Sequence, residues 1–157
     1  MLEIRIVNNS LDLTTAERIE SLKAGILTAL SFTLAYSIVV VGNSLVLAQF
    51  EGLAALQIPT PVNLLVKVAG AGLSGFLFGL TYRYVIRDDE NPHLKSGAVL
   101  AFGLVRGLAL LEMEQNWIDS FWLLGVLGVE SVFCFAIARF SLDWGLHHCW
   151  VKPFKSS

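Results

Sequence analysis

The stretch AGILTALSFTLAYSIVVVGNSLVLAQF, residues 24–50, contains no charged side chain. A helix needs about 20 apolar residues to cross the hydrocarbon core of a bilayer, and this run is longer than that. It therefore predicts a membrane-spanning helix.

Three more apolar segments follow, at about residues 62–86, 92–112 and 117–146. Asn91 followed by Pro92 is a favourable N-cap and first-turn pair for the third of them. Together with a first helix over about residues 14–50, these segments predict an all-α integral membrane protein with four transmembrane helices. The four spans use nearly the whole chain, so residues 1–157 are expected to form a single membrane domain.

The two ends of the chain contain no segment of spanning length. Residues 2–6 alternate between apolar and charged side chains, which predicts a short strand or an extended segment within an N-terminal arm of residues 1–13. Thr14 and Glu17 have the spacing of a capping box, which predicts that the first helix begins there. The arm lacks the apolar core of a signal peptide, so we expect no cleavage. Residues 147–157 are expected to form a C-terminal tail.

Two parts of the chain are similar to each other. Residues 22–25, LKAG, resemble residues 94–97, LKSG, and each group opens a long apolar run. The later parts of the two regions also align, with residues 72–83 opposite residues 128–139. This similarity predicts two tandem helical hairpins, a parallel repeat whose axis lies along the membrane normal.

Basic residues are unevenly distributed among the segments that flank the predicted helices. The N-terminal segment, the second connection and the C-terminal segment are rich in Lys and Arg, whereas the first connection offers only Lys67 and the third offers none. The positive-inside rule therefore places both termini in the cytoplasm, or in the stroma of a plastid. The sequence predicts a multi-pass protein of a plasma or inner membrane, or of a thylakoid in a photosynthetic source.

Composition excludes several classes of protein. Hydrophobic residues make up 55% of the chain and charged residues only 15%, against roughly a quarter in soluble domains. The formal net charge is −2, and no basic cluster is interleaved with aromatic residues, which argues against nucleic-acid binding. Two cysteines do not make a disulfide framework.

Glu130 is predicted to lie inside the fourth membrane span, where a carboxylate must be protonated, paired or hydrated. One hypothesis is a protonated Glu130 that bonds across helices to Tyr36, Ser37 or Thr33 at a comparable depth. The other is a role for this intramembrane polar site in binding an ion, a proton or a cofactor. The sequence leaves both open.

Arg106 and Lys67 are predicted to lie near the outer ends of their spans, where long basic side chains reach the membrane surface. Arg106 would then pair with Asp119, Glu112 or Glu51 in a ring of charges at the outer mouth. Anchoring of lipid headgroups or of the connections is the alternative.

Small residues recur at a spacing of four in two of the predicted spans. Such spacing lets another helix approach closely, with dispersion replacing the hydrophobic effect that lipid removes. The predicted helix-packing residues are Ala71, Gly75, Gly79, Gly103 and Gly107.

Motifs for chemistry are weak or misplaced. His147-His148-Cys149 resembles a ligand cluster, but neighbouring residues of a helix point in different directions. Residues 70–75 match G-x-G-x-x-G only inside a membrane span, where no strand precedes the motif. We therefore expect no catalytic residue, no metal and no cofactor.

These observations favour a non-catalytic accessory, assembly or structural subunit of a larger membrane complex. Its expected partners are the lipid bilayer and other membrane subunits or further copies of the chain. The alternative is a small oligomeric ion, proton or solute transporter or channel that uses Glu130. A membrane enzyme fits least well.

Overall fold

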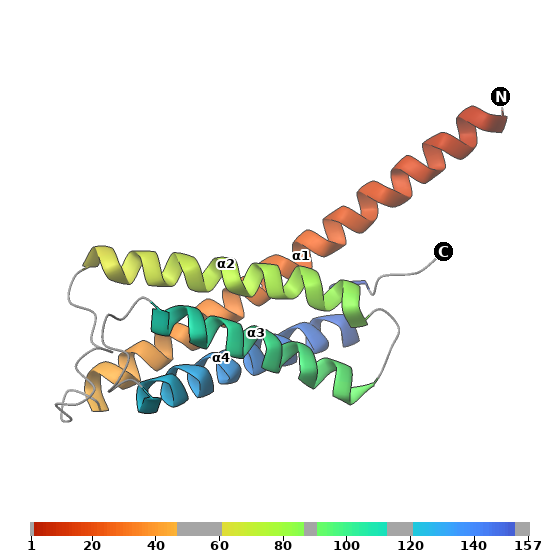
Figure 1. Ribbon diagram of the computed structural model, residues 1–157. Coiled ribbons are helices and arrows are strands. Elements are labelled where there is room, and N and C mark those ends of the chain that lie inside the picture. Colours follow the sequence, from red (N-terminus) through yellow and green to blue (C-terminus); the bar gives the residue numbers. More distant parts are fainter. Residues whose placement is uncertain (1, 47–60, 87–90, 113–120, 153–157) are drawn as a thin grey trace.

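The computed structural model describes residues 2–46, 61–86, 91–112 and 121–152 (Figure 1). This part of the chain contains the helices α1 (Leu2–Val46), α2 (Pro61–Ile86), α3 (Pro92–Glu112) and α4 (Phe121–His147). Each helix is long and apolar enough to cross a membrane, over Thr15–Leu45, Val62–Ile86, Pro92–Leu110 and Gly125–His147. The prediction of an all-helical chain with four such helices is confirmed.

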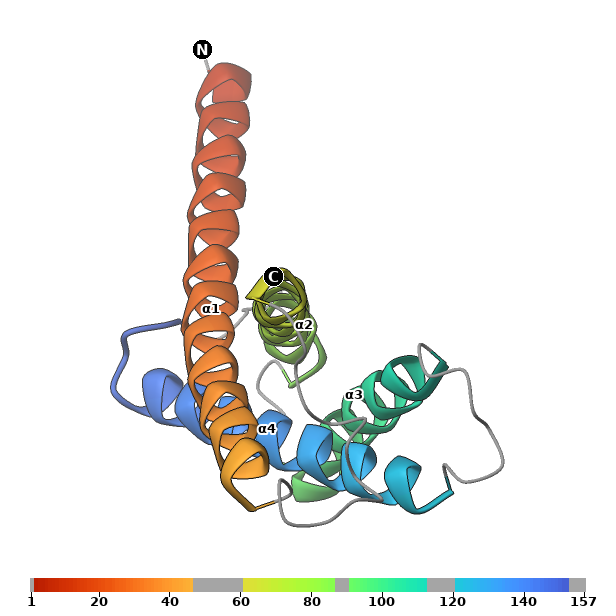
Figure 2. The ribbon, with the colours of Figure 1, turned by 90° about the vertical axis from the view of Figure 1, so that its left-hand side faces the viewer.

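Consecutive helices run in opposite directions and cross one another obliquely in the bundle (Figures 1 and 2). The most extensive contacts are those of α1 with α2 and of α3 with α4, and α1 also packs along α4. Helices α2 and α3 touch over much less of their length. The bundle is therefore least closed along this line, which we call the α2–α3 seam.

Each helix contributes one aromatic ring to the centre of the bundle. The ring centroid of Phe135 lies 4.5 Å from that of Phe32, 5.1 Å from that of Phe78 and 5.7 Å from that of Phe102. The ring planes are inclined to one another, an arrangement that aromatic pairs favour over face-to-face stacking. We call these four rings the aromatic cluster. They pack against one another at one level of the bundle and so connect all four helices.

Helix α2 approaches α1 closely at two glycines. A Cβ atom at Gly75 would lie 2.7 Å from Phe32 Cβ, and one at Gly79 would lie 2.7 Å from the carbonyl oxygen of Ala24. Real Cβ atoms do not approach other heavy atoms so closely. The two backbones can therefore be this near to each other only because both positions lack a side chain.

The contact between α3 and α4 is built in the same way. A Cβ atom at Gly103 would lie 2.8 Å from Val132 Cα, and one at Gly107 would lie 2.8 Å from Gly128 Cα. Ala71, the remaining small residue of the predicted packing set, is fully buried in the core.

The outer surface of the bundle is strongly apolar. Leu30 and Leu45 on α1, Leu65 on α2, Val105 on α3 and Val129 on α4 are each between 66% and 72% exposed. Large exposed apolar patches are rare on soluble monomers, whereas lipid tails solvate such a surface without cost.

The N-terminal arm differs from its prediction. Helix α1 begins at Leu2 and not at Thr14, and its first turns extend beyond the other helices (Figure 1). Five residues of alternation are too few to determine a strand. Once residues further along the chain have nucleated a helix, extending it backwards adds one hydrogen bond for each residue that is fixed. The predicted capping box therefore lies inside the helix.

The remaining boundaries agree with the predicted ones within a residue where the structure describes them. Helix α2 begins at Pro61, α3 ends at Glu112 and α4 ends at His147. The predicted end of the first helix at residue 50 and the predicted start of the fourth at residue 117 lie outside the described residues.

Candidate functional site

Glu130, on α4, has its partner on α1. The Asn43 side-chain amide donates a hydrogen bond of 2.7 Å to Glu130 Oε1. The predicted partners make other contacts: the Ser37 hydroxyl donates to the carbonyl oxygen of Thr33 at 2.8 Å, and Tyr36 lies beneath a guanidinium.

The choice of Asn43 follows from helix geometry. A side chain leans toward the N-terminus of its own helix. Because α4 runs antiparallel to α1, the Glu130 carboxylate is carried toward the C-terminal end of α1, about two turns beyond Tyr36. The sequence prediction compared backbone depths only and therefore selected the wrong partner.

Arg106 reaches from α3 into the bundle. Its Nη1 donates to Ser74 Oγ at 3.0 Å and to the carbonyl oxygen of Gly70 at 3.5 Å. Its guanidinium carbon lies 5.2 Å from the ring centroid of Phe32 and 5.1 Å from that of Tyr36. Dipoles of α2 and the electron-rich faces of two α1 rings thus surround the cation.

The predicted position of Arg106 at the outer mouth is therefore wrong. Ser74 is close to the midpoint of α2, so the guanidinium lies at mid-depth in the bundle. The lean of the side chain toward the N-terminus of α3 carries it away from the helix end at Glu112. None of the ion pairs among the described residues includes Arg106.

The other residues of the predicted outer mouth are not brought together with Arg106. Lys67 is half-buried on α2, and within the described part of the chain it forms no ion pair. Asp119 and Glu51 lie outside the described residues, as does the side chain of Glu112.

Arg83 forms a second polar site. It lies at the end of the bundle opposite the hydrogen bond between Asn43 and Glu130. Its guanidinium is fully buried: Nη2 lies 2.5 Å from Glu17 Oε2, and Nη1 donates to Ser21 Oγ at 2.6 Å. Its Nε donates to the carbonyl oxygen of Lys152 at 3.0 Å. One side chain of α2 therefore joins α1 to the segment that follows α4.

This segment folds back on the bundle through a helix C-cap. Cys149 has a φ of 59°, the left-handed conformation that reverses the chain at many helix ends. The Trp150 amide donates to the carbonyl oxygen of Gly145 at 2.9 Å, and the Lys152 amide donates to Glu20 Oε2 at 2.9 Å. What was predicted as a tail is therefore anchored as far as residue 152.

Asp143 is the centre of a third polar group, near the same end. It accepts a hydrogen bond of 2.9 Å from the Tyr82 hydroxyl and lies 3.4 Å from Arg139 Nε and 3.9 Å from Lys95 Nζ. Side chains of α2, α3 and α4 meet here. The group adds a cross-helix connection to the one that Arg83 makes.

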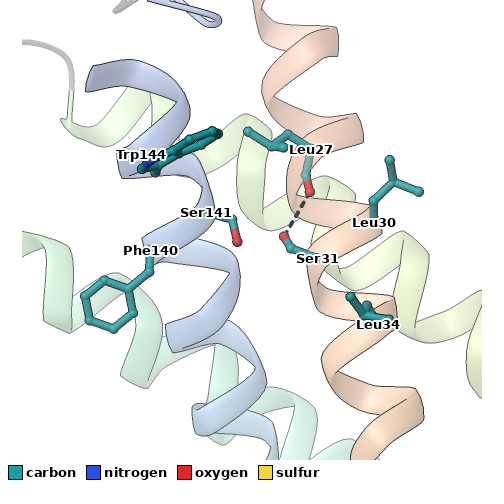
Figure 3. Close-up of a pocket in the computed structure, with 7 residues that line it drawn as sticks. All are labelled: Leu27, Leu30, Ser31, Leu34, Phe140, Ser141 and Trp144. Carbon is teal, nitrogen blue, oxygen red and sulfur yellow. Dashed lines mark hydrogen bonds between the residues drawn. The ribbon is translucent and has the colours of Figure 1, made fainter. Parts of the chain in front are cut away.

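An open groove of about 540 Å³ runs between α1 and α4 (Figure 3). Its lining residues are Leu27, Leu30, Ser31, Leu34, Phe140, Ser141 and Trp144. The hydroxyls of Ser31 and Ser141 donate to carbonyl groups of their own helices, at 2.9 and 3.0 Å. The groove is apolar and has no converging polar groups, so in a bilayer it would face lipid tails.

No group of three or more His, Cys, Asp or Glu side chains that could hold a metal ion occurs in the described part of the chain. Comparison with protein-family models, with curated proteins and with solved structures finds no match to this chain.

Sequence reasoning missed Asn43 and the buried role of Arg83. Arg83 was counted only as a charge that sets orientation. Its signal was the spacing: it lies four residues after Gly79, on the side of α2 that packs against α1. Asn43 carries one of the two side-chain amides in residues 24–50, and an amide in a membrane span is itself a signal of a partner on another helix.

Proposed function

We propose that the chain is a multi-pass integral membrane protein that acts as a non-catalytic accessory, assembly or structural subunit of a larger membrane complex. The observation that carries this proposal is the filled centre of the bundle, where the aromatic cluster takes one ring from each helix. A bundle filled in this way leaves no room for a path along its axis at that level. It suits a scaffold, which needs shape and stability and no reactive group.

The proposed orientation has both termini in the cytoplasm or the stroma. It is supported by the meeting of Glu17, Arg83 and Lys152 at one end of the bundle. Lys95 and Arg139 lie at this end as well, around Asp143, so basic side chains gather on the side that the positive-inside rule makes cytoplasmic.

We also propose that α1–α2 and α3–α4 are the two units of a parallel repeat. The support is that each helix packs most extensively against its neighbour within its own unit. In both units the close approach depends on glycines spaced by four. The membrane is a plasma or inner membrane, or a thylakoid in a photosynthetic source.

The experiment that tests the subunit proposal is purification of the full chain from its native membrane in a mild detergent. Other membrane proteins are expected to co-purify in a fixed ratio that survives a second, orthogonal column. A preparation containing only this chain, as a monomer or as a homo-oligomer, would contradict the proposal.

A second candidate function is transport of an ion, a proton or a solute by an oligomer. The observation that favours it is the half-buried Glu130 carboxylate, which is bonded to the neutral Asn43 and forms no ion pair in the described part of the chain. The path would have to lie between copies of the chain, since the centre of each bundle is filled. Purified chain in vesicles should then carry a flux that Glu130→Gln abolishes. Absence of flux in the parent, or an unchanged flux in the variant, would exclude this candidate.

A further inference from the structure

We propose that the α2–α3 seam is the docking surface for a transmembrane helix of a partner protein, and that a carboxylate at the middle of this helix binds Arg106. The inference rests on the proposed function as a subunit. It adds the place of contact and the chemistry of the partner.

The charge of Arg106 at mid-depth has no opposite charge beside it among the described residues. Charged side chains inside a membrane pair with an opposite charge or face water. Arg106 has a hydroxyl, a carbonyl oxygen and two aromatic rings around it, but no carboxylate among the described residues. These neighbours offer dipoles and ring faces and leave the net positive charge uncompensated.

Arg106 also has hydrogen-bond donors that no described residue uses. A guanidinium has five N–H groups in a planar fork that suits a carboxylate, and in the described part of the chain only Nη1 of Arg106 donates. Among the described residues no side-chain nitrogen or oxygen is both sealed from the surface and without a partner. The free N–H groups of Arg106 therefore reach the surface of the chain, where an incoming oxygen could meet them.

The surface around Arg106 is apolar and exposed. At about 100° per residue, Leu77 lies within about 60° of Ser74 on α2. Val105 lies about 100° around α3 from Arg106 and about 160° from Gly107, which packs on Gly128, so it is on the side of α3 away from α4. Leu77 is 48% exposed and Val105 is 68% exposed. A Cβ atom at Gly70 would meet nothing within 4 Å, so the α2 backbone is bare at the level of the guanidinium. An exposed apolar rim with a bare backbone is the kind of surface on which transmembrane helices pack.

Depth and geometry identify the carboxylate as that of another transmembrane helix. A lipid phosphate lies at the membrane surface, whereas Arg106 bonds to Ser74 near the midpoint of α2. Glu130 of the same chain is held by Asn43. An acidic residue near the middle of a neighbouring transmembrane helix lies at the depth of Arg106. The apolar residues of that helix can pack on the exposed apolar side chains around Arg106.

The test is photo-crosslinking of the full chain in its native membrane. A photo-reactive amino acid replaces Val105 at the seam or, as a control, Phe133, which is exposed on α4. The Val105 probe is expected to form an adduct with a membrane protein, through a peptide from a transmembrane segment that contains Asp or Glu. The Phe133 probe is expected to form none with that protein.

Charge variants then test the pairing. In the Val105-probe chain, Arg106→Gln is expected to lower the adduct yield at least tenfold, and Arg106→Lys should retain part of it. Lys67→Gln, which removes another basic side chain, and Asp119→Asn, which removes an acidic residue of the same chain, should leave the yield unchanged. If Arg106→Gln fails to fold, the exchanged pair provides the test: Arg106→Asp with Arg at the partner's acidic position should restore the adduct.

Several results would overturn the inference while the subunit proposal stands. They are an adduct that forms equally from Phe133, an adduct with lipid alone or with a second copy, a crosslinked helix without an acidic residue, and an undiminished yield in Arg106→Gln. Loss of the adduct in Asp119→Asn would also overturn it, because Arg106 would then serve a pair within its own chain. If the parent chain co-purifies with no membrane protein, the subunit proposal itself fails.

Discussion

Two arginines within the apolar helices have different surroundings, and the difference separates a structural role from a binding role. Arg83 is fully buried, with a carboxylate, a hydroxyl and a carbonyl oxygen around its guanidinium. Arg106 has no such carboxylate among the described residues. We therefore expect changes at Arg83 to lower the stability of the isolated chain and changes at Arg106 to affect association.

Replacement of Arg83 by Gln should destabilise the bundle by about 3 kcal/mol, because removing one partner of a buried ion pair leaves the other unsatisfied. Glu17 is partly exposed, so water can hydrate its carboxylate once Arg83 is removed. The loss in free energy of unfolding should therefore be at the lower end of the range for buried ion pairs. Reversible unfolding in mixed detergent measures the difference between variant and parent.

Arg18→Gln is the matched control for this change. Arg18 lies on the same part of the bundle surface as Glu17 but is exposed, so its replacement should alter the free energy of unfolding by less than about 0.5 kcal/mol. Equal losses in the two variants would show that the buried contacts of Arg83 do not form.

The pair of Asn43 and Glu130 predicts a measurable coupling. Hydrogen bonds between helices in membranes contribute about 0.6 kcal/mol on average in double-mutant cycles. A cycle of Asn43→Leu and Glu130→Leu, measured by unfolding in mixed detergent, should give a coupling of this order. A parallel cycle of Ser37→Ala and Glu130→Leu should give no coupling. Coupling to Ser37 and none to Asn43 would contradict the bond between Asn43 and Glu130 and favour Ser37 as the partner.

At the scale of whole helices, hydropathy and length were sufficient to predict α2 and α3 almost to the residue. The predicted start of the first helix at Thr14 is wrong for a different reason. Growth of a helix from an existing nucleus is cooperative, so the pattern of five local residues does not determine where the helix begins. The lateral pairing of helices and the rotation of each about its axis depend on side-chain direction. For this reason the partners of Glu130 and Arg106 could not be predicted from depth alone.

Helix contacts at the glycines give a prediction at this scale. In Gly79→Ala the new methyl group would meet Thr28 and the carbonyl oxygen of Ala24, so α2 must shift away from α1. We expect a loss of about 1–3 kcal/mol, as for other overpacked sites. The measurement is again the free energy of unfolding in mixed detergent.

Gly42→Ala is the control for the added methyl group. A Cβ atom at Gly42 would meet nothing within 4 Å, so this variant should be as stable as the parent, or more stable by up to about 1 kcal/mol through helix propensity. If Gly79→Ala were as stable as Gly42→Ala, the close packing of α1 on α2 would be excluded.

At the scale of the whole molecule, the bundle has an apolar exterior, a filled centre and basic side chains at one end. The first was predictable from composition, because lipid tolerates apolar surface that water does not. The aromatic cluster was not, since it brings together residues far apart in the chain, such as Phe32 and Phe135. The basic end was predictable from the distribution of Lys and Arg, but its pairs, such as Arg83 with Glu17, join helices and depend on long-range contacts.

The most direct test of the central claim is thiol labelling from the two sides of the membrane. A membrane-impermeant maleimide is applied to sealed vesicles of both orientations. The vesicles contain either the parent chain, whose Cys149 is exposed beyond α4, or a Cys149→Ser chain with Gln57→Cys between α1 and α2. We predict that Cys149 reacts only from the cytoplasmic or stromal side and that the cysteine at position 57 reacts only from the opposite side. Labelling of both from the same side would contradict a membrane-spanning α1, and with it the account of the chain as a multi-pass subunit.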